Sequence, residues 1–405
     1  MHTAEHNTYD VAVVGGGPAG ATAAEHLARQ GHAVALIDRP GYIKPCGGAI
    51  PPRAVDDFEI PAELLCTSVA SARMVGPSGH QVDMPIQDGY VGMVDRAEFD
   101  DWLRRRASDA GAELIPATYR HLEEHDDHVT IAYQEGRGGN DAATRHLTAR
   151  AVIGADGANS AVRRQASIQG PTDIPRVAAY HEIVQAPENP DDRCHPRRAD
   201  VYYQGTLSPD FYGWIFPHGD TISVGAGSAE KGFSLRHAVS SLREAAGLGE
   251  QEVATVRREG APLPMYPLKR WDNGRNIVLA GDAAGTVAPA SGEGIYYGMV
   301  SAQRAAEAVE QYLASGDGRA LKQAQRRFTR EHGQVFRILG TMQRYWYRDD
   351  DRRERFVRIC ADPDVQALTW DAYMNKRLAR ARPLAHLRIF FKNIAHLTGL
   401  APVRT

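Results

Sequence analysis

The N-terminal residues form a unit that few folds can accommodate. Residues 9–14 are rich in β-branched side chains and predict a short buried strand. A helix is expected over 18–29 and a second strand over 32–37. The turn before the helix carries glycines at the G-x-G-x-x-G spacing, namely Gly15, Gly17 and Gly20. This unit predicts a parallel sheet that binds a dinucleotide at the helix N-terminus.

Each glycine of this turn has its own expected role. Gly15 permits the tight turn, Gly17 leaves no side chain between backbone and pyrophosphate, and Gly20 lets the helix pack closely on the strand. Asp38 ends the second strand, where its carboxylate can accept from ribose hydroxyls. An acid at this position suits FAD or NAD better than NADP. A structural turn without a ligand is the alternative for the glycine pattern alone.

A second glycine motif follows a short strand expected over 151–153. It reads G-A-D-G at residues 154–157, and Asp156 and Gly157 form its turn. In isolation an Asp-Gly pair indicates only a turn. In a chain that already binds a dinucleotide, a later strand end is expected to add contacts to the same cofactor.

The third motif, L-A-G-D-A-A-G at 279–285, follows a buried strand expected over 276–280. Its Asp282 can hydrogen-bond ribityl or ribose hydroxyls. A helix over 294–313 follows, and backbone N–H groups at its N-terminus can stabilise negative charge on a reduced flavin. The three motifs in this order indicate FAD held by one domain assembled from distant parts of the chain.

Composition limits the remaining possibilities. At 405 residues, 43% hydrophobic content and a net charge of −3, the chain can bury a large core and is neither disordered nor a general nucleic-acid binder. No run of 18 apolar residues occurs, and residues 1–8 are polar, so we expect a cytoplasmic protein without a spanning helix. The cysteines show no C-x-x-C pairing, which argues against disulfides and a metal site; they are Cys46, Cys66, Cys194 and Cys360.

The fold class expected is α/β, with two domains of α+β character. A Rossmann-like parallel sheet binds FAD, an inserted antiparallel sheet holds the substrate, and the C-terminal region is helical. The boundaries expected are 1–85 and 86–172 for the first two parts of the FAD domain, 173–270 for the substrate domain, 271–315 for the last part of the FAD domain, and 316–405 for the helical region.

The motifs are similar to the fingerprints of the para-hydroxybenzoate hydroxylase-like flavoprotein superfamily, over nearly all of residues 9–315. This resemblance implies that the D-G motif contacts FAD and takes part in NADPH use. It also implies that Arg96, at the start of a helix expected over 94–110, touches the cofactor. The superfamily contains hydroxylases, halogenases and alkene reductases, so it implies a fold more firmly than a reaction.

A narrower resemblance lies in residues 43–51, I-K-P-C-G-G-A-I-P. This segment closely resembles one in the geranylgeranyl reductases of chlorophyll and bacteriochlorophyll synthesis, and residues 92–96, 212–217 and 386–397 look like the bacteriochlorophyll branch. The resemblance implies a photosynthetic oxidoreductase in which NADPH reduces FAD and three of four double bonds of a geranylgeranyl chain are saturated to phytyl. The implied substrates are geranylgeranylated bacteriochlorophyll or bacteriochlorophyllide, or geranylgeranyl diphosphate.

Motifs and resemblance together give a candidate site. Cys46 is the candidate catalytic residue, as the proton donor to the alkene; a small thiol that only packs against the cofactor is the alternative. The residues expected to bind the cofactor are Gly15, Gly17, Ala19, Gly20, Asp38, Arg39, Cys46, Gly47, Gly48, Arg96, Asp156, Gly157, Asp282, Gly292, Gly294 and Ile295.

Three aromatic residues alternate along an expected strand, which places them on one face: Tyr212, Trp214 and Phe216. They are candidates for the wall of a polyprenyl channel, with plain core packing as the alternative. Tyr296 and Tyr297 are weaker candidates for the same wall.

Other functions remain open at this point. A flavin-dependent aromatic hydroxylase of the same fold is one alternative. A flavin halogenase is disfavoured, because Tyr212 and Phe216 differ from the halogenase W-x-W-x-I-P pattern and no lysine suggests itself for activated halogen. A prenyl-binding escort protein is the non-enzymatic alternative, but such proteins lose FAD and all three FAD motifs are present here.

The C-terminal residues bear on partners. Apolar residues recur at helical spacing over 384–400, with basic residues among and before them, and such a helix either packs on the body or lies on an anionic membrane. Peripheral contact with the inner, photosynthetic membrane and contact with other pigment-synthesis enzymes therefore stay open. No second G-x-G-x-x-G is present for NADPH, and Arg163 and Arg164 can attract its phosphates.

Overall fold

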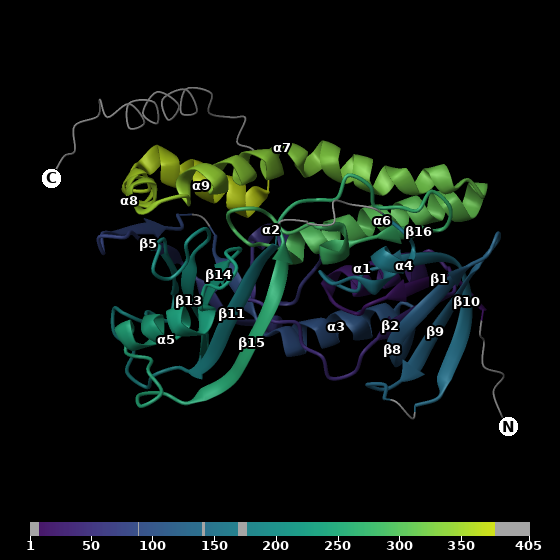
Figure 1. Ribbon diagram of the computed structural model, residues 1–405, viewed down its shortest axis with the longest axis horizontal. Helices are drawn as coiled ribbons and strands as arrows, with labels where there is room; N and C mark the ends of the chain where they lie inside the picture. Colours follow the sequence, from purple (N-terminus) through teal and green to yellow (C-terminus); the bar gives the residue numbers. More distant parts are fainter. Residues whose placement is uncertain (1–7, 88, 140–141, 169–175, 377–405) are drawn as a thin grey trace. The chain divides into compact units, whose positions relative to one another are not determined.

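The computed structural model describes residues 8–87, 89–139, 142–168 and 176–376 (Figure 1). Its chain divides into two compact units, each built from three segments. The nucleotide unit comprises residues 1–46, 96–177 and 261–339, and the sheet unit comprises 47–95, 178–260 and 340–405. The segmentation expected from sequence assigned 47–85 to the first part of the FAD domain. The structure places this segment in the sheet unit, because its strands pair there.

The nucleotide unit contains a six-stranded sheet in which β1 lies between β2 and β10, and β16 lies on the other side of β10. These four strands are parallel, whereas β9 runs antiparallel to both β8 and β10. The strands are β1 (Thr8–Val14), β2 (Val34–Asp38), β8 (Glu113–Glu124), β9 (Val129–Glu135), β10 (Thr144–Gly154) and β16 (Ile277–Leu279).

Helices cover this sheet. Helix α1 (Pro18–Arg29) packs against both α3 (Arg96–Asp109) and α6 (Ile295–Ser315). Small side chains on its buried side allow this close packing, among them Ala21, Ala23 and Ala24. The predicted strand-helix-strand unit is confirmed, with the helix at its predicted bounds.

The sheet unit contains a seven-stranded sheet in the order β15-β11-β14-β13-β12-β5-β6, and a small sheet in the order β3-β7-β4. The larger sheet consists of β15 (Thr255–Pro264), β11 (Arg176–Gln185), β14 (Thr221–Ser228), β13 (Gly213–His218), β12 (Arg198–Tyr202), β5 (Ser71–Val75) and β6 (Gln81–Pro85). The smaller one consists of β3 (Ala49–Ile50), β7 (Val91–Val94) and β4 (Leu65–Val69).

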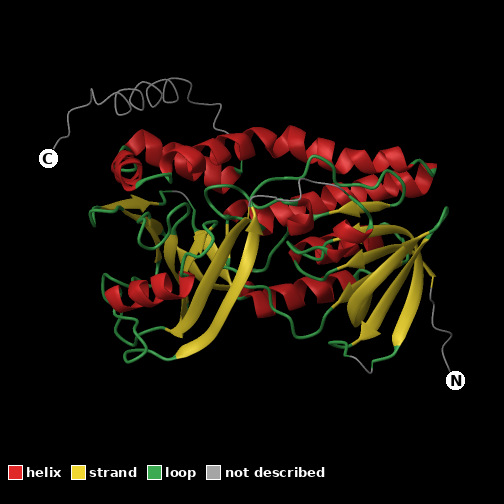
Figure 2. Ribbon diagram, viewed as in Figure 1, coloured by secondary structure: helices red, strands yellow, loops and turns green. Residues whose placement is uncertain are grey.

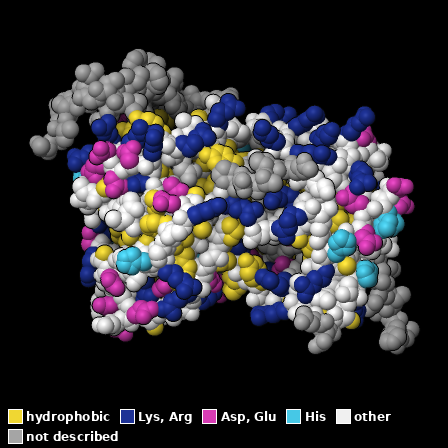
Figure 3. Space-filling view, in the orientation of Figure 1, with side chains coloured by type: hydrophobic (Ala, Val, Ile, Leu, Met, Phe, Trp, Pro, Cys, Tyr) yellow, Lys and Arg dark blue, Asp and Glu magenta, His cyan; other side chains and the backbone are white. Residues whose placement is uncertain are grey.

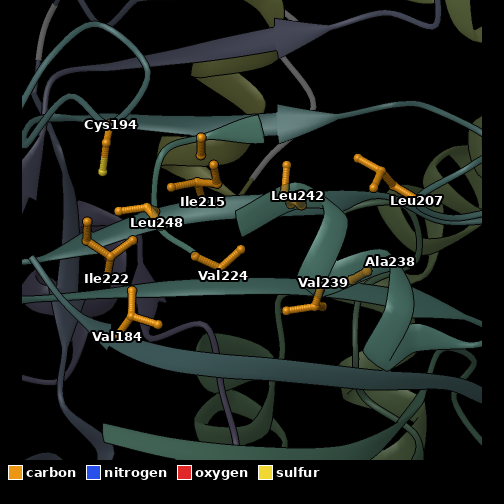
Figure 4. Packing of buried hydrophobic residues seen from close by; sticks show 12 residues of the cluster. Val184, Cys194, Leu207, Ile215, Ile222, Val224, Ala238, Val239, Leu242 and Leu248 are labelled. Carbon is orange, nitrogen blue, oxygen red and sulfur yellow. The ribbon is translucent and has the colours of Figure 1, made fainter. Parts of the chain in front are cut away.

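One face of the larger sheet packs on helix α5 (Leu235–Ala245). Alternate residues of β14, such as Ile222 and Val224, meet Val239 and Leu242 of the helix in a dry cluster (Figure 4). The residues between them, including Ser223, therefore point to the opposite face. Because alternate residues of β14 pack on α5, the residues between them form the opposite face of the sheet.

The remaining described helices confirm the predicted helical C-terminal region as far as residue 376 (Figure 2). They are α7 (Lys322–Trp346), α8 (Asp350–Ile359) and α9 (Pro363–Asn375), and shorter helices are α2 (Pro52–Asp57) and α4 (Ala161–Gln165). Basic side chains gather at the surface over α7 (Figure 3). No helix among the described residues is long and apolar enough to cross a membrane. The predicted amphipathic stretch over 384–400 lies outside the described residues.

Candidate functional site

The three glycine motifs meet at one edge of the nucleotide unit's sheet. Val14, Gly154 and Leu279 are paired across β1, β10 and β16, and each is the last residue of its strand. Since parallel strands end on the same side, the segments that follow them lie together. Ligands of such sheets bind at the carboxyl ends of the strands, where these motifs lie.

The first motif fits a pyrophosphate. Gly15 has φ +102°, and a Cβ there would overlap the carbonyl oxygen of Ala155 in the second motif. A Cβ on Gly20 would overlap the Gly15 carbonyl, so this glycine allows the helix to approach the turn. By contrast, a Cβ on Gly17 would meet only an Arg96 nitrogen, at 4.0 Å. The open space at Gly17 is where a phosphate can approach the backbone.

The N-terminus of α1 supports the same conclusion. Its N-cap residue is Gly17, no side chain caps it, and no acidic residue lies in the first turn. The first N–H groups of a helix attract an anion by hydrogen bonding and by the helix dipole. The described residues therefore fit the diphosphate of FAD at this position.

Arg96 is a buried cation beside this helix start. Its guanidinium donates to both oxygens of Asp100, at 2.7 Å each, and hydrogen-bonds Cys46. Burial disfavours the charged guanidinium, but Asp100 and then Cys46 outweigh it and raise the pKa of Arg96. Sequence reasoning missed Asp100, although an Arg-Asp pair four residues apart on an expected helix is a detectable signal.

Asp38 is positioned by the first motif. One carboxylate oxygen accepts from the Gly16 N–H at 2.9 Å and the other from Arg104 at 3.2 Å. Burial raises the pKa of this carboxyl, and the Gly16 and Arg104 contacts act against that effect. Asp38 thus lies at the strand end where a ribose is expected, and Arg104 is an additional residue there that the sequence did not indicate.

The loop after Asp38 is held at two points of the nucleotide unit. Lys44 forms an ion pair with Asp282 of the third motif, and Cys46 contacts Arg96. Arg39 lies over the ring of Tyr42, 4.2 Å from its centroid. The segment that carries the family resemblance is therefore attached directly to residues of the flavin motifs.

The Asp156 side chain hydrogen-bonds the backbone of residues that follow it closely in the sequence. Its Oδ2 accepts from the N–H groups of Ala161 at 2.6 Å and Val162 at 3.1 Å, at the start of α4, whose N-cap is Ser160. Burial raises the pKa of this carboxyl, and the helix contacts oppose the rise. Gly157 has φ +81° with nothing near its Cβ position. Contact of these two residues with the cofactor remains a prediction.

A basic group follows this turn. Arg163 and Arg164 lie on α4, and Arg176 donates to Asn159 at 2.8 Å. The pKa of Arg163 is lowered, first by burial and then by repulsion from Arg176 and Arg164. A cation under such repulsion gains from a bound anion.

The third motif brings together a helix start and an acid. Asp282 is nearly buried and lies 3.8 Å from the Cβ position of Gly294, the N-cap of α6. Glu293 accepts from the Tyr296 N–H at 2.8 Å, which satisfies one donor of the first turn. The third motif also contacts α1, because a Cβ on Gly281 would lie 2.7 Å from Ala19. Gly292 precedes this helix start and Ile295 is the first residue of α6; contact of both with the cofactor remains a prediction.

The sheet unit carries an aromatic face opposite α5. Tyr212 and Trp214 meet edge to face, and Trp214 stacks on Phe216 with ring centroids 6.1 Å apart. The predicted common face is therefore present. Tyr212 and Trp214 are buried and Phe216 is partly buried, and a contact of all three with substrate remains a prediction.

This face reaches the family segment. A Cβ on Gly47 would lie 3.3 Å from the Phe216 ring, and one on Gly48 would overlap His218 and the Val94 carbonyl. Gly48 is thus needed for close packing on β13, whereas a side chain at Gly47 would make a tight contact with Phe216. His218, which sequence reasoning missed, donates from Nδ1 to the Phe216 carbonyl oxygen at 3.1 Å, and burial lowers its pKa.

Tyr296 and Tyr297 are buried among aromatic residues of the nucleotide unit. Both rings meet His332 of α7, and Tyr297 also packs on Phe328 and Phe336. They pack between helices, and a contact of either tyrosine with substrate remains a prediction.

Comparison with known proteins identifies the sequence relatives. Residues 8–335 match the family model described as an FAD binding domain. The chain is 51% identical to the geranylgeranyl diphosphate reductase of Rhodobacter capsulatus over 394 residues, which cover 97% of this chain and 98% of that protein. It is 36% identical to the protein of the same name from Synechocystis over 410 residues, covering 97% and 99%.

Solved structures show the same fold. A geranylgeranyl bacteriochlorophyll reductase-like protein from Thermoplasma acidophilum superposes with a TM-score of 0.79 at 21% identity, covering 93% of this chain and 99% of that one. A flavin-dependent brominase superposes with a TM-score of 0.74 at 18% identity, covering 95% and 99%. At these identities the structures establish the fold alone, and they confirm the predicted α/β class.

Proposed function

Because this chain belongs to the family of geranylgeranyl reductases and carries its FAD-binding domain, we propose that it reduces geranylgeranyl chains with FAD as cofactor and NADPH as electron donor. Three of the four double bonds would be saturated, which leaves a phytyl chain. The substrates proposed are geranylgeranyl diphosphate and geranylgeranylated bacteriochlorophyll or bacteriochlorophyllide.

The attachment of residues 44–46 carries this proposal. Lys44 pairs with Asp282 and Cys46 contacts Arg96, so the segment that resembles the reductases is built into the flavin motifs. Together with the near-full-length identity to geranylgeranyl diphosphate reductases, this attachment favours alkene reduction over hydroxylation.

Reduction adds a hydride to one alkene carbon and a proton to the other. When bound, FAD supplies the hydride. The protein must hold the alkene, exclude water and deliver the proton. Tyr212, Trp214 and Phe216 are suited to the first two tasks, because aromatic side chains offer large rigid apolar surfaces.

Cys46 is the proposed proton donor. It is a partly buried thiol outside any disulfide, and it hydrogen-bonds the Arg96 guanidinium. If Cys46 only packs against the cofactor, Cys46→Ser will leave single-turnover alkene reduction unchanged, and the catalytic role is then excluded.

NADPH is proposed to bring its phosphates to Arg163, Arg164 and Arg176. Repulsion within this group lowers the pKa of Arg163, and an anion relieves it. Arg163→Gln is expected to raise KM for NADPH without changing FAD content. Equal KM values for the two proteins would place NADPH elsewhere.

A peripheral location is proposed from the substrate and the tail. The substrate chain is apolar, and the sequence over 376–400 is basic with apolar residues at helical spacing. Truncation after Pro383 tests this: loss of binding to anionic vesicles with a retained fold supports it. Unfolding without a change in membrane partition contradicts it.

One experiment tests the function as a whole. The purified protein is incubated anaerobically with NADPH and a geranylgeranyl substrate, and product masses are followed. Stepwise gain of two hydrogen atoms per double bond is expected. NADPH loss with oxygen uptake in air and no hydrogenated product would instead identify a hydroxylase.

A further inference from the structure

A chain of hydrogen bonds crosses four adjacent strands of the sheet unit. The Trp214 indole nitrogen on β13 lies 3.1 Å from the Ser223 hydroxyl on β14, which lies 2.9 Å from His181 Nδ1 on β11. His181 Nε2 lies 3.2 Å from Glu259 on β15. The strands are neighbours in the order β15-β11-β14-β13, so the chain runs straight across the sheet.

The chemistry of the groups determines the direction of the two outer bonds. An indole N–H can only donate, so the Ser223 oxygen accepts from Trp214. The Glu259 carboxylate only accepts, so His181 Nε2 carries a proton and donates to it. With His181 neutral, the Ser223 hydroxyl donates to Nδ1, whereas a protonated His181 donates from Nδ1 to the Ser223 oxygen.

The Trp214 indole occupies space that is open only because residue 225 is glycine. Gly225 is the cross-strand partner of both Trp214 and His181. A Cβ on Gly225 would overlap the Trp214 ring and lie 2.7 Å from the His181 Cβ. The indole therefore lies flat over β14, where Ser223 can reach its nitrogen.

The burial of these polar side chains indicates that the row of hydrogen bonds has a role beyond stabilising the fold. A buried hydrophobic strand pair does not need a histidine and a serine, and polar groups away from water are costly unless they are paired. His181 is 4% exposed and Ser223 is fully buried. Their common end point is the indole that stacks on Phe216, which in turn packs on Gly47 beside Cys46.

We propose that Glu259, His181 and Ser223 are positioning residues that hold the Trp214 indole against the prenyl chain and so set which double bonds are reduced. This inference rests on the proposed function. The bonds fix both the rotation and the tilt of the ring, because the nitrogen must meet Ser223 while the ring lies over Gly225. If the indole is free to move, it no longer limits how far the prenyl chain of the substrate enters the site.

Indole NMR tests the positioning directly. The chain has five tryptophans, so protein labelled with ¹⁵N-tryptophan gives five indole signals, and Trp214→Phe identifies one of them. Ser223→Ala is expected to shift the Trp214 signal and speed its exchange with water. Ser223→Thr should restore it, and His181→Asn, which keeps an acceptor near Nδ1 but loses Glu259, should shift it less.

Ser228→Ala is the matched control, since Ser228 is a buried serine on the same strand that donates to Asp210 at 2.8 Å. It should leave the Trp214 signal in place.

In kinetics, Ser223→Ala is expected to raise KM for the geranylgeranyl substrate about tenfold, the effect of one lost hydrogen bond, and to enrich partly reduced products. Reduction of FAD by NADPH without substrate should be unchanged.

The outcomes separate the inference from the proposed function. An unmoved Trp214 signal in Ser223→Ala overturns the hydrogen-bonded chain. A moved signal with wild-type KM and product masses overturns its role toward substrate. If the wild-type protein reduces no geranylgeranyl chain, the proposed function fails, whereas the NMR result still tests the positioning. Should Ser223→Ala not fold, Glu259→Leu, which removes the acceptor for His181 Nε2–H, replaces it with the same readouts.

Discussion

At the scale of single residues, the candidate site depends on side chains that serve two segments at once. Lys44 and Asp282 are 238 positions apart, yet their ion pair ties the family segment to the third motif. Arg96 likewise connects Asp100 on its own helix with Cys46. A motif search along the sequence finds only one residue of each such pair, and it does not show that the two residues are in contact.

Replacing Lys44 is expected to weaken the flavin site. Lys44→Met leaves the nearly buried Asp282 carboxylate without its cation, which should cost about 1–3 kcal/mol of stability and reduce FAD affinity about tenfold. Thermal unfolding and FAD titration of the apoprotein measure the two effects. Lys44→Arg is the control that keeps the charge. Equal melting and FAD binding in Lys44→Met and wild type would contradict the role.

His218 should make stability depend on pH. Its pKa is lowered from 6.5, mainly by burial and also by His181, against the effects of the Phe216 carbonyl and Asp95. The unfolded chain therefore takes up a proton near pH 6.5 that the folded protein does not. Stability contributed by neutral His218 is present above pH 6.5 and is lost as pH falls below it.

The measurement is the free energy of unfolding between pH 7.5 and 5. The wild-type protein should lose more stability on acidification than His218→Gln, which keeps a polar side chain that does not titrate. Parallel curves for the two proteins would show that His218 has the same pKa in the folded and unfolded states.

At the scale of elements, β14 shows how one strand serves two purposes. Ile222, Val224 and Ala226 pack toward α5, and Ser223 and Gly225 face the aromatic side. The alternation of a strand makes this division automatic. One face of the strand therefore supplies core residues, and the other face contacts the Trp214 ring.

Gly225→Ala is expected to destabilise the sheet unit by about 1–3 kcal/mol, since the new methyl group overlaps the Trp214 ring. Chemical denaturation measures the loss, and the indole signal of Trp214 should move. Gly213→Ala on β13 is the matched control, because its Cβ would meet neighbours only at ordinary distances of 3.5 Å and more. A similar loss in both variants would argue against a specific role for Gly225.

At the scale of the whole molecule, the proposed FAD site draws on segments of the nucleotide unit that lie far apart in the chain, 15–20, 38–46, 96–104 and 279–295. A ligand that binds only the assembled site stabilises the fold as a whole.

Removal of FAD should consequently lower the melting temperature, and added FAD should raise it with concentration. At one hundred times Kd the gain should be about 2.7 kcal/mol. Differential scanning calorimetry of the apoprotein with graded FAD checks this. Lys44→Met should need more FAD for the same shift, whereas Gly213→Ala should follow the wild-type curve. A melting temperature independent of FAD would contradict an assembled site.

The sequence by itself determined the nucleotide-binding unit, its three motifs and the reductase resemblance, because local spacing of glycines, strand residues and an acid reflects the short-range geometry of turns and helix starts. It also placed Tyr212, Trp214 and Phe216 on one face through simple alternation. Only the tertiary structure brought Lys44 to Asp282, His218 to Gly48, and Ser223 to both Trp214 and His181. Those contacts depend on strand pairing between distant segments, and no local pattern in the sequence encodes which strands become neighbours.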